Sequence, residues 1–165
     1  MTLMLCLLLS ASPDAGVAVT LKVDGAQIKP AALTVKDLEA LGAATVEFTD
    51  KKGAHTGLGV RLDTVLLHLG FSEGASGPKV DPKQKHAGLR SVVVATARDG
   101  FEAVFSVGEL LETLGSTRAL IVWQMDGKPL PENVGPFRIA VANDKLPSRS
   151  IYQVTSLKVV DLSSR

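Results

Sequence analysis

Three Asp-Gly dipeptides, each beside a run of apolar residues, constrain the fold of this chain more than any other feature of its sequence. The dipeptides occupy positions 24–25, 99–100 and 126–127. The apolar runs beside them span residues 17–23, 91–97, 101–105 and 119–125. Asp-Gly favours the tight turns that follow β-strands, since glycine adopts positive φ without steric cost. The pattern therefore predicts several short strands joined by turns, with a hairpin around Asp99-Gly100.

Three further segments carry helix signals. Thr34 with Asp37 three residues later forms a capping-box pattern, and Ser106 with Glu109 forms a second one. Between them, leucine and valine recur at helical spacing over residues 62–69. We therefore expect three short helices among the strands.

The remaining apolar segments add strands to this pattern. They span residues 45–49, 137–142 and 151–160. Residues 71–90 are rich in glycine, proline and charged side chains and predict a long surface loop, whereas residues 57–61 are interpreted as a turn of the chain. Strands outnumber helices and no strict βαβ alternation is present, so the sequence predicts a single mixed α+β domain.

An apolar run at residues 3–9 is too short to cross a membrane as a helix. Small residues follow it, as they do in a secretory signal peptide. We therefore expect residues 1–18 to be a signal peptide, residues 19–165 to be the folded domain, and the protein to be periplasmic or secreted. Cys6 is the only cysteine and lies in this leader, so thiolate chemistry is not expected in the folded part.

Charge and motifs disfavour several classes of function. The net charge of +1 indicates no strongly basic surface, so no nucleic-acid partner is expected. His55, His68 and His86 lack the close spacing of metal ligands, so no protein-ligated metal is predicted. The sequence contains no Gly-x-Ser-x-Gly motif, so nothing in it indicates a hydrolase of that class. Of the three histidines, His55 follows a turn and is the candidate for lining a pocket, whereas His68 is expected on the surface.

The loop at residues 142–150 carries the clearest binding signal. Its arginine, Arg149, presents a planar fork that can bind a phosphate, a carboxylate or the polar edge of a pterin. Ser148 and Ser150 flank this arginine with hydroxyl groups. The alternative is a solvated loop in which the serines cap local turns.

Several motifs, taken in order, resemble the molybdopterin-binding domain of the sulfite oxidase family. They are residues 59–66, 99–101, 126–131, 135–139 and 151–154. They are most similar to the small, exported, single-domain branch of that family. The resemblance implies an α+β fold with a mixed, barrel-like sheet and a pterin site near residues 148–150. In catalytic members a cysteine binds molybdenum from the loop after the strand that matches residues 46–49, and here that loop reads Asp50-Lys51-Lys52-Gly53.

The resemblance therefore implies binding without a protein-ligated metal. We predict an exported protein that binds a pterin or molybdopterin, a small heterocyclic ligand, to sense it or to present it to a membrane-bound signalling or redox partner. The predicted ligand-binding residues are Arg149, Ser148, Ser150, Arg61, Asp99, Asp144 and His55. In this prediction the arginines donate hydrogen bonds, and Asp99 or Asp144 accepts them. Trp123 and Tyr152 are candidates for stacking on the ligand, although the apolar strand around Trp123 favours the core.

A second function stays open. It is a molybdopterin-dependent oxidoreductase that binds its metal through the dithiolene of the cofactor alone and passes electrons to a separate redox protein. This function predicts molybdenum in the purified protein, whereas the binding function predicts a pterin without metal. A protein with neither would be an interaction module that keeps the fold without a ligand.

Overall fold

The computed structural model describes residues 19–74, 78–81, 85–115 and 117–164. The predicted signal peptide at residues 1–18, with Cys6, lies outside the described residues. Within the described ranges, no helix combines the length and the apolar character needed to cross a membrane.

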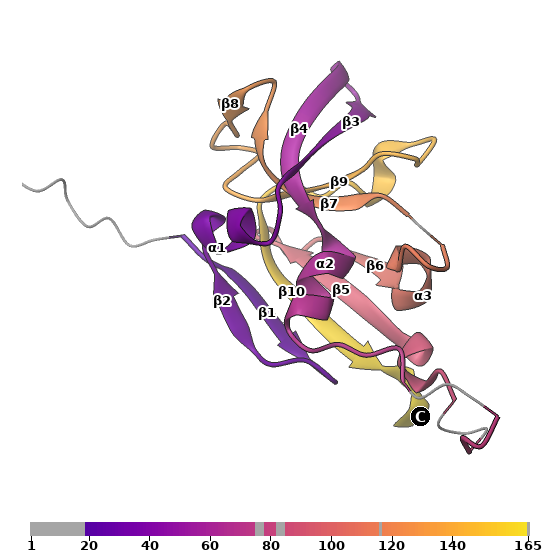
Figure 1. Cartoon of the computed structure of the whole chain (residues 1–165). Helices are drawn as coiled ribbons and strands as arrows, with labels where there is room; N and C mark the ends of the chain where they lie inside the picture. Colours follow the sequence, from indigo (N-terminus) through magenta and orange to yellow (C-terminus); the bar gives the residue numbers. More distant parts are fainter. Residues whose placement is uncertain (1–18, 75–77, 82–84, 116, 165) are drawn as a thin grey trace, which may run out of the picture.

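Two five-stranded sheets make up most of the fold (Figure 1). The first has the order β2 (Ala31–Leu33), β1 (Leu21–Gly25), β10 (Val154–Asp161), β5 (Ser91–Ala97) and β6 (Glu102–Ser106). The second has the order β3 (Ala44–Asp50), β4 (Gly53–Arg61), β7 (Ala119–Met125) and β8 (Lys128–Pro129), with β9 (Arg138–Val141) also paired to β7. The described part of the chain is mostly sheet with few helices, which confirms the predicted α+β class.

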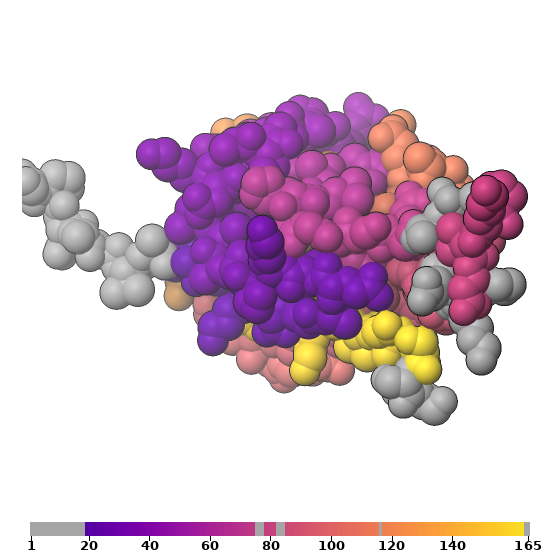
Figure 2. All heavy atoms as spheres, turned by 60° about the horizontal axis from the view of Figure 1, so that its bottom comes forward, coloured from indigo at the N-terminus to yellow at the C-terminus, as the bar shows by residue number. Residues whose placement is uncertain are grey.

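The first sheet contains strands from both ends of the described chain. β1 runs parallel to β10, with Val23 opposite Leu157, whereas β10 and β5 run antiparallel, as do β5 and β6. The β5–β6 hairpin turns at Asp99-Gly100, as the sequence predicts. Figure 2 shows the N-terminal part of the described chain, in indigo, directly beside the C-terminal strand, in yellow.

One large core lies between the two sheets. Val93 and Leu157 of the first sheet belong to the same cluster of buried apolar side chains as Ile121 and Ile139 of the second. The helix α2 (Leu62–His68) packs its apolar side onto this cluster. Because side chains alternate along a strand, the second sheet also presents an opposite face. A smaller apolar cluster covers that face and consists of Val46, Phe48, Leu120, Val122 and Ala140.

Both predicted capping boxes are present in the structure. At the start of α1 (Val35–Ala40), the Thr34 side chain accepts the Asp37 N–H, and the Asp37 side chain accepts the Thr34 N–H. Ser106 and Glu109 form the same reciprocal pair at the start of α3 (Val107–Leu110). The sequence therefore locates the beginnings of these two helices correctly.

α3 is shorter than the sequence predicts. Leu110, Leu111 and Leu114 recur at helical spacing after Ser106 and predict a helix that reaches residue 114, but the chain leaves the helix at Leu111, where the backbone becomes extended. It then folds back onto the helix, and the Gly115 N–H donates to the Gly108 carbonyl. Leu114, the last of these leucines, therefore belongs to a turn that folds back against α3.

Residues 57–61 form a strand and not the predicted turn. They belong to β4, which pairs with β3 on one side and with β7 on the other. Two glycines provide the space for this packing: a Cβ on Gly57 would lie 2.9 Å from the Phe48 side chain, and a Cβ on Gly59 would lie 2.3 Å from the Ile121 carbonyl oxygen. The prediction was wrong because these glycines reflect the close approach of strands.

Two connecting segments also differ from the boundaries that the sequence predicts. The predicted surface loop at residues 71–90 ends in a short 3₁₀ helix, η1 (Ala87–Arg90), and the last strand begins at Val154 instead of Ile151. Ile151 pairs with Ile139 in an isolated bridge, so the chain returns to β9 before it enters β10. The remaining 3₁₀ helices are η2 (Pro147–Arg149) and η3 (Leu162–Ser164).

Candidate functional site

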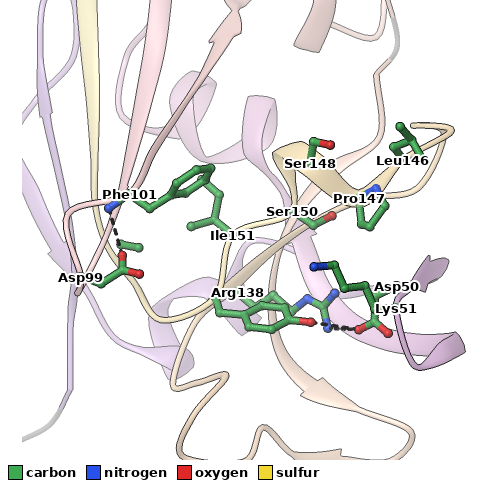
Figure 3. Close-up of a pocket in the computed structure, with 12 residues that line it drawn as sticks. Asp50, Lys51, Asp99, Phe101, Arg138, Leu146, Pro147, Ser148, Ser150 and Ile151 are labelled. Atoms are coloured by element: carbon green, nitrogen blue, oxygen red, sulfur yellow. Dashed lines mark hydrogen bonds and ion pairs between the residues drawn. The ribbon is translucent and has the colours of Figure 1, made fainter.

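A cavity of about 610 Å³ opens where β3, the β5–β6 turn, β9 and the segment at residues 146–152 meet (Figure 3). Aromatic, aliphatic, hydroxyl and charged side chains together form its walls. In Figure 3, Arg138 lies between a wall that carries Asp99 and Phe101 and a wall that carries Lys51 and Leu146. The lining residues are Asp50, Lys51, Ala97, Asp99, Phe101, Arg138, Leu146, Pro147, Ser148, Ser150, Ile151 and Tyr152.

Arg138 is completely buried, with 0% of its surface exposed, although arginine rarely lies in a core unless it is paired. Its guanidinium carbon lies 4.4 Å from the centre of the Phe48 ring and 4.6 Å from that of Tyr152, so two aromatic rings enclose it. Nη1 donates to Asp50 Oδ2 at 3.2 Å. Nε and Nη2 have no hydrogen-bond partner among the described residues. These two atoms form the side of the guanidinium that can bind two acceptor atoms at once.

Asp50 balances the charge of Arg138 and organises the same wall of the cavity. Its side chain is 4% exposed, and its carboxylate accepts the Lys52 N–H at 2.8 Å and the Tyr152 hydroxyl at 3.2 Å. Burial acts to raise the pKa of Asp50, but the Lys52 N–H and the Arg138 charge outweigh it and hold that pKa below its ordinary value. Burial, together with the Asp50 charge, raises the pKa of Tyr152. The carboxylate is therefore the acceptor and the phenol the donor.

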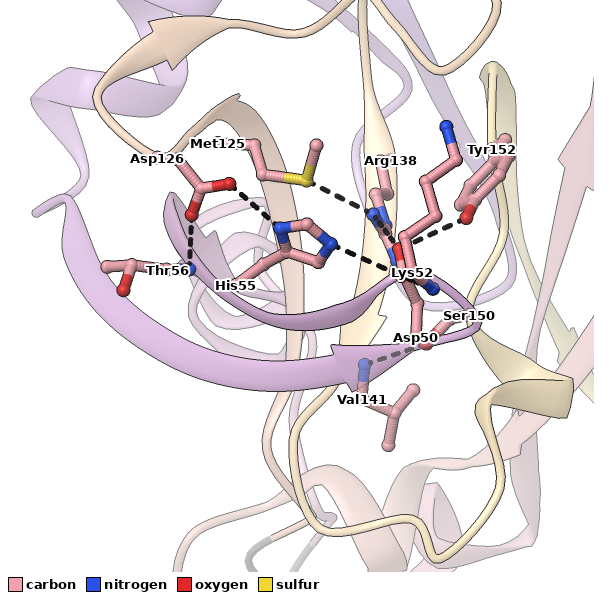
Figure 4. Close-up of polar contacts among 10 residues, drawn as sticks. All are labelled: Asp50, Lys52, His55, Thr56, Met125, Asp126, Arg138, Val141, Ser150 and Tyr152. Atoms are coloured by element: carbon pink, nitrogen blue, oxygen red, sulfur yellow. Dashed lines mark hydrogen bonds and ion pairs between the residues drawn. The ribbon is translucent and has the colours of Figure 1, made fainter.

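A histidine links this buried carboxylate to the protein surface (Figure 4). His55 Nδ1 lies 2.8 Å from Asp126 Oδ2, and its Nε2 lies 3.2 Å from Asp50 Oδ1 without forming a regular hydrogen bond. The Thr56 N–H donates to Asp126 at 2.9 Å and, with His55, holds the pKa of Asp126 below its ordinary value. Because an ionised carboxylate only accepts hydrogen bonds, His55 Nδ1 is the donor to Asp126.

Three of the predicted ligand-binding residues line the cavity, namely Asp99, Ser148 and Ser150. Asp99 accepts the Phe101 N–H at 2.9 Å and so stabilises the turn that places the Phe101 ring at the cavity. The Ser150 hydroxyl accepts the Val141 N–H at 3.3 Å, which holds this part of the loop against β9. The structure thus brings the β5–β6 turn and the serine-containing loop to one cavity.

Arg149 and Asp144 bind each other outside the cavity lining. Nε and Nη2 of Arg149 donate to the two Asp144 carboxylate oxygens at 2.9 and 2.7 Å, and Nη1 donates to Glu109 at 3.0 Å. The hydrogen bonds that Arg149 donates to Asp144, with the one that it donates to Glu109, raise the pKa of Arg149, so its charge is permanent. The fork that was expected to bind a ligand holds the loop to α3.

Arg61, His55 and Trp123 also lie outside the cavity lining. Arg61 donates to Asp63 at 2.9 and 2.7 Å, and these hydrogen bonds raise the pKa of Arg61. His55 reaches the cavity only through the carboxylate that it shares with the buried arginine. Trp123 is 4% exposed and belongs to the core, as the apolar strand around it favours. Tyr152, the other stacking candidate, does line the cavity.

Four charged or aromatic residues of the cavity are not among the predicted ligand-binding residues: Asp50, Lys51, Phe101 and Arg138. The sequence does contain a signal for Arg138, which is the one charged residue in the apolar segment at residues 137–142. A charge within an otherwise apolar strand indicates a buried ion pair or a ligand site, because burying it unpaired is costly. The ion pair is present at Arg138, which is bound to Asp50.

Within the ranges that the structure describes, no group of three or more His, Cys, Asp or Glu side chains could hold a metal ion. The cavity instead offers a ligand contacts of three other kinds. Arg138 lines the cavity and has a pair of N–H donors without a partner, Ser148 and Ser150 supply hydroxyl groups, and Phe101 supplies an aromatic ring. This set suits a planar organic molecule with polar edges.

No protein-family model and no curated protein matches this chain. Among solved structures, the chain is similar to the sulfane dehydrogenase SoxCD from Paracoccus pantotrophus, with a TM-score of 0.63 and 15% sequence identity. The similarity covers 87% of this chain and 38% of that chain, so this chain spans well under half the length of the neighbour. At this identity the similarity shows a shared fold, and the dehydrogenase activity belongs to the neighbour.

Proposed function

We propose that this domain binds a planar, pterin-like heterocycle in the cavity at Arg138, without a protein-ligated metal. The observation that carries the proposal is the unpartnered Nε–Nη2 side of a completely buried arginine in a cavity of about 610 Å³. A buried donor without a partner costs about 1–3 kcal/mol, so a ligand with acceptor atoms removes an existing penalty. The volume also lies within the usual range of small-molecule sites.

The other lining residues fit the rest of such a ligand. Phe101 is 50% exposed and Tyr152 is 39% exposed, so both rings are accessible for stacking. Asp99 supplies acceptor atoms for a ring amino group, and Ser148 and Ser150 supply hydroxyl groups that donate or accept. A pterin has the matching features, namely a flat ring, a carbonyl acceptor and an amino donor.

The resemblance and the fold both support this proposal. The sequence motifs resemble a molybdopterin-binding domain, and the fold is similar to that of a sulfane dehydrogenase. In the loop where the resemblance implies a metal-binding cysteine in catalytic members, Asp50 pairs with Arg138 and Lys51 lines the cavity. Neither side chain is a soft ligand of the kind that a thiolate provides. We therefore favour an exported binding protein, which senses its ligand or presents it to a membrane-bound partner, over metal-centred oxidation and reduction.

The contents of the purified protein distinguish this function from a molybdopterin oxidoreductase that holds its metal through the dithiolene alone. Fluorescence of an acid extract detects a bound pterin, and elemental analysis detects molybdenum. We expect a pterin without stoichiometric molybdenum. Both together would indicate the oxidoreductase, and neither would indicate an interaction module.

Phe101→Ala is expected to weaken binding of 6-methylpterin, a neutral pterin, about fivefold, because the ligand loses a stacking contact of about 1 kcal/mol. Val104→Ala is the matched control: Val104 is 52% exposed, close to the 50% of Phe101, and lies outside the cavity lining. Fluorescence titration measures both affinities. Equal affinities in the two variants would contradict the proposed site.

A second variant tests the arginine itself. Arg138→Lys keeps a positive charge beside Asp50 but lacks the planar pair of donors. We expect this variant to bind 6-methylpterin more weakly than Phe101→Ala does, with thermal denaturation used to verify that the variant is folded. Retained affinity in a folded Arg138→Lys variant would remove the guanidinium from the proposed site.

A further inference from the structure

Arg138 and His55 approach different oxygens of one carboxylate. Asp50 Oδ2 accepts Nη1 of Arg138 at 3.2 Å, and Asp50 Oδ1 lies 3.2 Å from His55 Nε2. Figure 4 shows Asp126 on the side of the imidazole that faces away from Asp50. The Asp126 side chain is 52% exposed. A continuous series of contacts therefore runs from a solvent-exposed carboxylate to an arginine that faces the cavity.

The protonation state of His55 decides how much of the Asp50 charge is available to Arg138. When His55 is neutral and its Nδ1–H is donated to Asp126, the imidazole carries no charge and Asp50 balances Arg138 alone. Protonated His55 donates its Nδ1–H to Asp126 and places a positive charge 3.2 Å from Asp50 Oδ1, so Asp50 then shares its negative charge between two cations. The cavity side of Arg138 is less neutralised in this second state, so it attracts an anion more strongly.

The other charged groups around His55 are carboxylates, a lysine and an arginine, and these types of side chain ordinarily keep their charge between about pH 5.5 and 7.5. Histidine is the side chain that ordinarily changes charge within this range. Two of the charged residues, Glu47 and Asp50, lie on β3, and Arg138 lies on β9. Lys52 lies in the β3–β4 turn and Asp126 in the turn after β7.

We propose that His55 is a positioning residue whose protonation tunes the cavity for anionic ligands. In the protonated state, the cavity binds more tightly a heterocycle that carries a carboxylate or a similar anion at the Nε–Nη2 side of Arg138. The inference rests on the proposed function and specifies the charge of the ligand. Lys51, which also lines the cavity, adds a second cation near the same site. The affinity for a neutral heterocycle depends much less on the protonation state of His55.

Two fluorescent probes, pterin-6-carboxylate and neutral 6-methylpterin, test the inference by titration between about pH 5.5 and 7.5. We expect the affinity of the wild-type protein for pterin-6-carboxylate to rise about fivefold as the pH falls through this range, and its affinity for 6-methylpterin to change little. His55→Gln is expected to abolish the rise. His68→Gln, at the exposed end of α2, is the matched control and is expected to retain it.

Asp126→Asn tests the coupling from the solvent side and leaves the buried ion pair intact. Without the Asp126 carboxylate, protonated His55 loses one of its two anionic neighbours, so a smaller rise in affinity is expected between about pH 5.5 and 7.5. An unchanged pH dependence in Asp126→Asn and in folded His55→Gln would overturn the role of His55 and leave the proposed function in place. Failure of both probes to bind at any pH would refute the proposed function, and the inference with it.

Discussion

Replacing Asp50 with alanine is expected to lower the free energy of unfolding by about 3–5 kcal/mol, because the change leaves a buried charge without its partner. Arg138 is 0% exposed, and Asp50 forms its ion pair at 3.2 Å. The Phe48 and Tyr152 rings that enclose the guanidinium are attracted to it, but they carry no compensating charge. Urea denaturation followed by circular dichroism measures the loss.

Asp126→Ala is the matched control for this prediction. It removes a carboxylate from the same network, but its side chain is 52% exposed whereas that of Asp50 is 4% exposed, so a much smaller loss is expected. Combining Asp50→Leu with Arg138→Met removes both buried charges and is expected to restore much of the stability. Equal losses in Asp50→Ala and Asp126→Ala would show that the buried pair contributes little to the fold.

Asp50 also connects three parts of the cavity wall. Asp50 ends β3, and its carboxylate joins this strand to Arg138 on β9 and to Tyr152 in the connection to β10. An ion pair and a hydrogen bond thus connect β3, β9 and the segment before β10.

The elements of the fold could be predicted from the sequence more readily than their pairing. The capping boxes at Thr34 and Ser106 depend on residues three positions apart, and both are present. The parallel pairing of β1 with β10 instead joins strands from opposite ends of the described chain. Strand pairing depends on which neighbours bury each face, and a local pattern does not contain that information.

The same distinction between local and long-range information applies to the site. The two serines of the 142–150 loop line the cavity, but the arginine between them does not. Arg149 donates through three nitrogens to carboxylates, whereas Arg138 donates to a carboxylate through one. Which arginine keeps an unpartnered side therefore depends on acidic residues that reach it from other elements. Sequence spacing gives no measure of this.

β4 provides the clearest case in which tertiary contacts reverse a local interpretation. Its glycines are typical of a turn, yet the strand lies between β3 and β7. The register between β4 and β7 shifts between Leu58 and Gly59, and this irregularity brings Gly59 against the backbone at Ile121. β4 also carries His55, so its fit against β7 determines where the imidazole lies relative to Asp126.

Gly59→Ala is therefore expected to destabilise the protein by about 3 kcal/mol, because the new Cβ would lie 2.3 Å from the Ile121 carbonyl oxygen and two paired strands must move apart. Gly108→Ala, in α3, is the matched control: its Cβ would meet no atom closer than 3.9 Å, and alanine favours helix, so stability is expected to stay equal or rise. Chemical denaturation compares the two variants, and similar stabilities would contradict the close approach. Because neither glycine has a positive φ, the difference measures the space between β4 and β7 and not backbone strain.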